Sequence, residues 1–159
     1  MASAIVVCTD GSELAQRAAT EGIAILQPAD SVVVATVVED ADPALAYDGS
    51  GHAGPTMTEQ QFEELRATEH DRARSAIDAL VAALPSGNVA SRIVEGRAGP
   101  ALCDLAREVQ ARALVVGSRG RGGVKRALLG SVSDYVVRNA PCPVVVIGTA
   151  SLSDDTANA

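Results

Sequence analysis

Short runs of β-branched apolar residues alternate along this chain with segments of helical periodicity, and this alternation restricts the folds that it can adopt. The five runs cover residues 4–8, 31–38, 89–94, 113–116 and 144–147. Strands separated by helices favour right-handed crossovers and a parallel sheet. The pattern therefore predicts an α/β fold: a single doubly wound, five-stranded, mostly parallel sheet with helices on both faces.

The runs differ in how continuously apolar they are. Residues 4–8, 31–38, 113–116 and 144–147 are nearly unbroken, which is typical of strands buried on both faces. Residues 89–94 alternate more between apolar and polar side chains, so we expect that run at an edge of the sheet.

Helical periodicity fills the intervals between the runs. A first helix over residues 12–27 should stop at Pro28, because proline cannot continue a helix. Thr56 and Glu59 match a capping box that would open a long second helix. That helix should end before Pro85.

Two further helices are predicted in the second half of the chain. The third should begin at Pro100, and the fourth should carry Leu128, Leu129, Val132 and Val136 before Pro141. The apolar stripes of all these helices are expected to face the core.

The length and cysteine content favour one intracellular domain. The 159 residues suffice for one domain with a real core and are too few for two. We see no signal peptide and no apolar run of about 18 residues, so no membrane span is expected. Cys8, Cys103 and Cys142 are odd in number and widely spaced, which fits buried, reduced thiols of a cytoplasmic protein.

The charge balance argues against nucleic-acid and membrane partners. The formal net charge is −7, and aromatic residues, the usual platforms for stacked bases, make up only 2%. Four basic residues nevertheless fall in one short segment, at Arg119, Arg121, Lys125 and Arg126. On charge alone, a solvated basic loop and an anion site remain equal alternatives.

The same segment, residues 117–131, contains five glycines between a predicted strand and a predicted helix. Glycine lets the backbone approach a ligand closely, and a helix start with basic side chains nearby favours phosphate. The segment therefore makes an anionic ligand, a nucleotide above all, the leading hypothesis.

A second candidate residue is Asp10, which directly follows the first predicted strand. Open α/β sheets bind ligands beyond the carboxyl ends of their strands. Asp10 could accept hydrogen bonds from ribose hydroxyls or hold a metal. By residue type alone, however, a helix N-cap or turn former is the more common role.

The glycine spacing excludes two familiar nucleotide motifs, since neither a G-x-x-x-x-G-K-[ST] loop nor a G-x-G-x-x-G fingerprint is present. The spacing is Gly117-x2-Gly120-x9-Gly130-Ser131. It resembles the ATP-binding signature of the universal stress protein family, G-x2-G-x9-G-[ST]. The resemblance continues through residues 140–144 and includes the first strand with Asp10, and it covers about residues 4–148.

The resemblance implies a Rossmann-like, adenine nucleotide α-hydrolase-like domain over residues 1–148. The resemblance is weakest at about 41–57, where the glycine-rich composition predicts a variable loop, and the polar residues 149–159 are expected to form a tail. The loop is expected to be a tolerated surface insertion, with a lid over the pocket as the alternative.

The resemblance also implies residue roles. Asp10 would contact the ribose, and the backbone at Val37 or Val38 would meet adenine. Glycines would let the chain pass close to the ribose and phosphates, and Ser131 would donate hydrogen bonds to phosphate. The full set of expected nucleotide-binding residues is Thr9, Asp10, Val37, Val38, Gly117, Ser118, Arg119, Gly120, Gly122, Gly130, Ser131, Val132 and Ser133.

Cofactor and partner follow from the same resemblance. The expected ligand is ATP, accompanied by Mg²⁺ or Mn²⁺, and the expected partner is a second copy joined through Val144, Val145, Val146 and Ile147. Thr36 departs from the histidine that many members carry, and is expected to alter the pocket wall.

The sequence shows no arrangement of residues that is typical of a catalytic site. His52 and His70 are expected at the surface, and no Ser/His/Asp or metal-ligand pattern converges. We therefore expect a cytoplasmic ATP-binding stress-response regulator that binds its nucleotide rather than turning it over. The alternatives are a slow ATP hydrolase, or an AMP- or cyclic-AMP-binding interaction module of the same fold.

Overall fold

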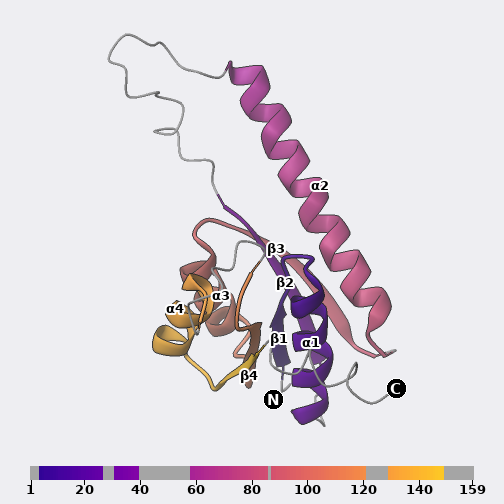
Figure 1. The fold of residues 1–159 in the computed structure, drawn as a ribbon, viewed down its shortest axis with the longest axis vertical. Helices are drawn as coiled ribbons and strands as arrows, with labels where there is room; N and C mark the ends of the chain where they lie inside the picture. The colour runs from indigo at the N-terminus through magenta and orange to yellow at the C-terminus, as the bar shows by residue number, and fades with distance from the viewer. Residues whose placement is uncertain (1–3, 27–30, 40–57, 86, 121–128, 149–159) are drawn as a thin grey trace, which may run out of the picture.

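The computed structural model describes residues 4–26, 31–39, 58–85, 87–120 and 129–148. Strands and helices alternate through them, as predicted (Figure 1). In chain order they are β1 (Ala4–Cys8), α1 (Glu13–Ile25), β2 (Ser31–Val38), α2 (Glu59–Ala83), β3 (Val89–Glu95), α3 (Ala98–Glu108), β4 (Ala113–Gly117), α4 (Ser131–Asn139) and β5 (Val144–Ile147).

The strands form one five-stranded sheet of order β3-β2-β1-β4-β5, and every pairing in it is parallel. The central strand is β1, where Val6 pairs with Val33 on one side and Leu114 on the other. The chain runs outward from β1 to β3, then returns to add β4 and β5 on the opposite side. The strand order therefore reverses between β1 and β4, where such sheets place their ligands.

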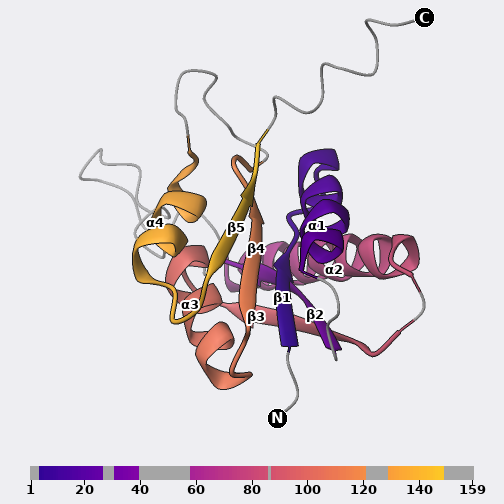
Figure 2. The same cartoon turned by 90° about the horizontal axis from the view of Figure 1, so that it is seen from below.

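Helices cover both faces of the sheet. Figure 2 shows α1 and α2 on one side and α3 and α4 on the other. Alternate side chains of β1 serve the two layers: Ile5 and Val7 pack with the cluster under α1 and α2, and Val6 packs with the cluster under α3 and α4. Burial on both faces explains why the residues of β1 are almost all apolar.

The two edge strands of the sheet can be compared with what the sequence predicted for residues 89–94 and 144–147. The alternating strand β3 lies at an edge, which confirms the expectation for residues 89–94. Strand β5 forms the other edge, where we expect a second copy to pair. The expected burial of residues 144–147 on both faces is only partly met. Val144, Val145 and Val146 are only half-buried.

Helix ends also differ in detail from the predictions. The capping box of α2 is formed by Thr58 and Gln61, not by Thr56 and Glu59. Thr58 Oγ1 accepts from the Gln61 N–H at 3.2 Å, and Gln61 Oε1 accepts from the Thr58 N–H at 2.8 Å. Both threonines begin a pattern of the same spacing, and glutamine closes the box as well as glutamate.

The helix α3 begins two residues before Pro100. Proline is tolerated there because N–H groups of the first turn have no partner within the helix. The helix α4 begins at Ser131 and excludes Leu129, while Leu128 lies outside the described residues. The loop at 41–57 and the tail at 149–159 also lie outside them. Among the helices that the structure describes, none has both the length and the hydropathy to cross a bilayer.

The contact between α1 and β4 yields a stability prediction at Gly22. A Cβ at Gly22 would lie 2.4 Å from Cγ1 and 3.2 Å from Cβ of Val115, a side chain only 1% exposed. Alanine normally stabilises a helix interior by about 1 kcal/mol over glycine. Here overpacking costs about 1–3 kcal/mol and outweighs that gain.

We therefore expect Gly22→Ala to lower the midpoint of thermal unfolding by at least about 2–4 °C, monitored by circular dichroism. The double variant Gly22→Ala with Val115→Ala should lose less stability than the two single changes summed. A higher midpoint for Gly22→Ala alone would contradict the packing argument.

Candidate functional site

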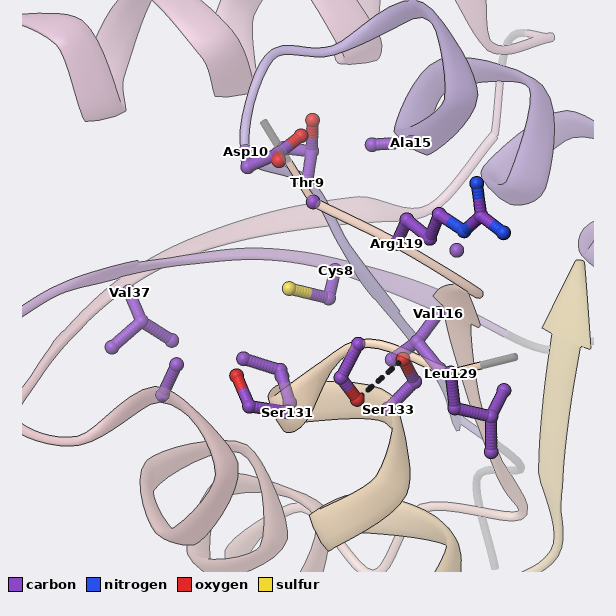
Figure 3. A pocket seen from close by; sticks show the side chains of 15 residues that line it. Cys8, Thr9, Asp10, Ala15, Val37, Val116, Arg119, Leu129, Ser131 and Ser133 are labelled. Atoms are coloured by element: carbon purple, nitrogen blue, oxygen red, sulfur yellow. Dashed lines mark hydrogen bonds between the residues drawn. The ribbon is translucent and has the colours of Figure 1, made fainter. Parts of the chain in front are cut away.

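A pocket of about 470 Å³ opens where the sheet order reverses, between the carboxyl ends of the central strands and the start of α4 (Figure 3). Loops after β1 and β4 contribute to its wall together with the end of β2 and the first turns of α1, α3 and α4. The lining residues are Cys8, Thr9, Asp10, Ala15, Val37, Ala98, Val116, Gly117, Arg119, Gly120, Leu129, Gly130, Ser131, Val132 and Ser133.

The turn after β1 holds Asp10 against the pocket. Gly11 adopts φ +80°, a conformation that glycine accepts without strain. The Gly11 N–H donates to Thr9 Oγ1 at 3.0 Å, and the Ser12 N–H donates to Asp10 Oδ1 at 2.9 Å. Asp10 is thus a turn former, while Ser12 caps α1 by accepting from the Ala15 N–H at 3.2 Å.

The second carboxylate oxygen of Asp10 reaches across to the glycine-rich segment. A Cβ built on Gly120 would lie 3.1 Å from Asp10 Oδ2. The turn-forming role and a ligand-binding role for Asp10 are therefore compatible, since its two oxygens face different neighbours.

The two ends of the glycine-rich segment are held together by backbone hydrogen bonds. The Gly130 N–H donates to the Ser118 carbonyl at 2.7 Å, and Ser133 Oγ lies 3.0 Å from that carbonyl. Ser133 Oγ also lies 3.2 Å from the Gly130 carbonyl, the contact drawn dashed in Figure 3. The Ser118 N–H in turn donates to the Ile147 carbonyl of β5 at 2.7 Å.

The start of α4 faces the pocket with its backbone. Gly130 is the N-cap residue and makes no side-chain capping bond. N–H groups at such a helix start lack intrahelical partners and carry partial positive charge. Since Ser131 and Val132 line the pocket, this end of α4 is suited to an anion.

The remaining wall is apolar. Val37 and Val116 come from the ends of β2 and β4, Ala98 is the first residue of α3, and Cys8 ends β1. Burial, and then the negative charge of Asp10, raises the pKa of the Cys8 thiol to about 12. The thiol is therefore protonated at neutral pH, so Cys8 contributes an uncharged surface to the pocket and is not a nucleophile.

Most of the residues singled out from the sequence meet at this pocket. Those that line it are Thr9, Asp10, Val37, Gly117, Arg119, Gly120, Gly130, Ser131, Val132 and Ser133. Val38 and Ser118 are buried and do not line it. Strand alternation directs the Val38 side chain away from the face that Val37 presents. Gly122, like Arg121, Lys125 and Arg126, lies outside the described residues.

Sequence reasoning missed Cys8, Ala15, Ala98, Val116 and Leu129 as lining residues. Cys8 and Val116 end or nearly end their strands, so strand topology could have identified them. Ala98 follows the edge strand β3 and carries no chemical signature. Thr36 does not line the pocket, so the expected change in the pocket wall is not seen.

The two histidines do not appear among the described residues that line the pocket. His70 lies on α2, where Nε2 is 3.1 Å from Glu95 Oε1, and His52 lies outside the described residues. Over the described ranges, no three His, Cys, Asp or Glu side chains come together as a possible metal site.

Known protein families, sequences and structures resemble this chain over most of its length. The model of the universal stress protein family matches residues 1–148. A universal stress protein of Methanocaldococcus jannaschii is 29% identical over 143 residues, which cover 90% of this chain and 80% of the relative.

Two solved structures extend the likeness to the fold. The universal stress protein UspA of Lactobacillus plantarum has a TM-score of 0.72 at 29% identity, covering 91% of this chain and 97% of its own. A universal stress protein crystallised in complex with cAMP has a TM-score of 0.61 at 28% identity, covering 94% and 98%. Because the family model spans nearly the whole chain and the glycine spacing agrees with it, the chain belongs to the universal stress protein family.

Proposed function

We propose that this protein binds ATP in the pocket between β1 and β4, and that it acts as a nucleotide-dependent regulator in the cytoplasm. One observation carries the proposal. The carboxylate of Asp10, the backbone of Gly117 and Gly120, and the start of α4 at Ser131 line the same cavity.

The cavity suits a nucleotide in size and polarity. Small-molecule pockets span about 300–1,000 Å³ and combine apolar walls with a few polar groups. The volume here is about 470 Å³. Its apolar wall at Val37 and Ala98 would take the base, and the helix start of α4 would take the phosphates.

Individual roles follow from this orientation. Asp10 would accept hydrogen bonds from ribose hydroxyls, and the backbone at Val37 and Val38 would meet adenine. Phosphate contacts would come from the segment that links β4 to α4. The residues of this segment that we assign to the nucleotide site are Ser118, Arg119, Gly122, Gly130, Ser131, Val132 and Ser133. Thr9, next to Asp10, is assigned to the same site.

A divalent cation, Mg²⁺ or Mn²⁺, would accompany the triphosphate. Magnesium is commonly held by one or two carboxylates together with phosphate oxygens, so a dedicated protein cage is not required. Asp10, the acidic side chain among the lining residues, is assigned to the ribose, so the cation would be held by phosphate oxygens and water. The cation would offset phosphate charge.

A second candidate ligand is cAMP or AMP, favoured by the similar universal stress protein that was crystallised with cAMP. ATP remains the proposal because the start of α4 and Arg119 offer positive charge for additional phosphates. The proposal is for binding with at most slow hydrolysis of ATP.

Gly130 tests the site directly. A Cβ there would meet Arg119 Cα and the Ser118 carbonyl oxygen at an ordinary 3.5 Å, so alanine fits. The two extra methyls of valine would displace the segment or fill the phosphate path. We expect Gly130→Val to weaken ATP binding by at least about tenfold, since overpacking costs about 1–3 kcal/mol.

The measurement is calorimetric titration of the wild type with ATP, AMP and cAMP, followed by titration of both variants. Gly130→Ala serves as the control and should bind ATP far better than Gly130→Val. The Gly130 backbone lies at φ −73°, which any residue adopts, so both variants should fold. Wild-type affinity in a folded Gly130→Val would remove this segment from the site.

Asp10 tests the ribose contact. We expect Asp10→Ala to weaken ATP by about tenfold or more, because hydrogen bonds to charged groups contribute about 1.5–3 kcal/mol. Binding of 2′,3′-dideoxy-ATP should change little, since that sugar has no hydroxyls to donate. Asp10→Asn keeps an acceptor for the Ser12 N–H and controls for loss of the turn. Equal losses for both nucleotides would argue against a ribose contact.

We further propose a homodimer through β5, whose residues Val144, Val145, Val146 and Ile147 form an open sheet edge. The carbonyls of Pro143 and Ile147 accept from β4, so alternation directs the polar backbone of Val146 outward. Val146→Pro removes one outward N–H and should convert a dimer into a monomer. Light scattering at micromolar concentration measures the mass; a monomeric wild type would refute the proposal.

A further inference from the structure

The hydroxyl of Thr36 is buried beneath the turn that carries Asp10. Thr36 is 3% exposed and lies among the apolar residues 32–38 of strand β2. Its Oγ1 donates a hydrogen bond to the backbone carbonyl of Thr9. Valine has the same shape and an equal preference for strands, so neither packing nor propensity calls for a hydroxyl here.

This hydrogen bond is made at Thr9, the first residue after the end of β1. The ladder between β1 and β2 pairs Cys8 with Ala35, and the Thr9 N–H donates to the Ala35 carbonyl at 2.9 Å. The Thr36 hydroxyl then holds the carbonyl of the same residue. Both polar groups of the Thr9 backbone are thus anchored to β2, and the carbonyl belongs to the peptide plane that joins Thr9 to Asp10.

Asp10 depends on the orientation of that plane. Its Oδ1 accepts from the Ser12 N–H at 2.9 Å, and its Oδ2 faces Gly120 across the pocket. Rotation of the Thr9–Asp10 peptide would shift both oxygens together. Ligand-binding groups need to be held within about 0.5 Å of their productive geometry.

We propose that Thr36 is a positioning residue for ribose recognition: its hydrogen bond to the Thr9 carbonyl holds the Asp10 carboxylate where it accepts from the sugar hydroxyls. The inference rests on the proposed function. It assigns part of the ribose selectivity to a side chain that does not itself line the pocket.

The test compares Thr36→Val with Thr36→Ser by calorimetry, using ATP and 2′,3′-dideoxy-ATP as probes. Thr36→Val should weaken ATP by about three- to tenfold, the range for loss of one hydrogen bond. It should leave dideoxy-ATP unchanged, so the preference for ATP shrinks. Thr36→Ser keeps the hydroxyl and should retain the wild-type preference.

A double-mutant cycle makes the assignment sharper. In an Asp10→Ala background, Thr36→Val should cause no further loss of ATP affinity, because the group that it positions is absent. Should Thr36→Val not fold, Thr36→Ala removes the same donor without adding volume and carries the same expectation.

The possible failures are distinguishable. A wild type that prefers ATP to dideoxy-ATP, together with a Thr36→Val variant that keeps this preference, would overturn the positioning role alone. Equal losses of both nucleotides in Thr36→Val would overturn it as well, since they indicate a general structural role. A wild type that binds neither nucleotide would overturn the proposed function and this inference together.

Discussion

The parallel pairing of β1 with β4 is the interaction on which the site depends. It joins two strands whose following loops leave the sheet separately, one into α1 and the other toward α4. The register sets Val7 beside Val115, so the turn at Asp10 and the glycine-rich segment begin at nearly the same level. The pocket lies between these two segments, at the carboxyl ends of β1 and β4.

Backbone groups line that pocket together with polar side chains such as Asp10 and Arg119. Glycines at 117, 120 and 130 bring the chain near the cavity, and α4 presents N–H groups at its start. The Ser118 carbonyl closes the segment by accepting from Gly130, and the Ser118 N–H binds the end of β5. A protein with a net charge of −7 can thereby offer a local site for an anion without a broadly basic surface.

The secondary-structure predictions are correct where the local sequence pattern and the tertiary environment agree. They differ from the structure where contacts with other elements set the burial of a strand or the start of a helix. Strand β1 was predicted with its observed bounds because burial on both faces requires a continuous apolar run. Strand β5 carries the same pattern, yet three of its four residues are only half-buried, since its composition does not reveal what covers its faces. The capping box moved from Thr56 to Thr58 because two overlapping patterns satisfy the same rule.

The sequence by itself determined the fold class, the family and the positions of the two loops that form the site. Hydrophobic periodicity and glycine spacing are local properties, and they are readable without knowing which residues touch. Only the tertiary structure decided that Val37 rather than Val38 faces the pocket, that Ala98 joins it from the start of α3, and that the Thr36 hydroxyl donates to the Thr9 carbonyl next to Asp10. These features depend on register between strands distant in sequence, and register is set by packing of the whole sheet.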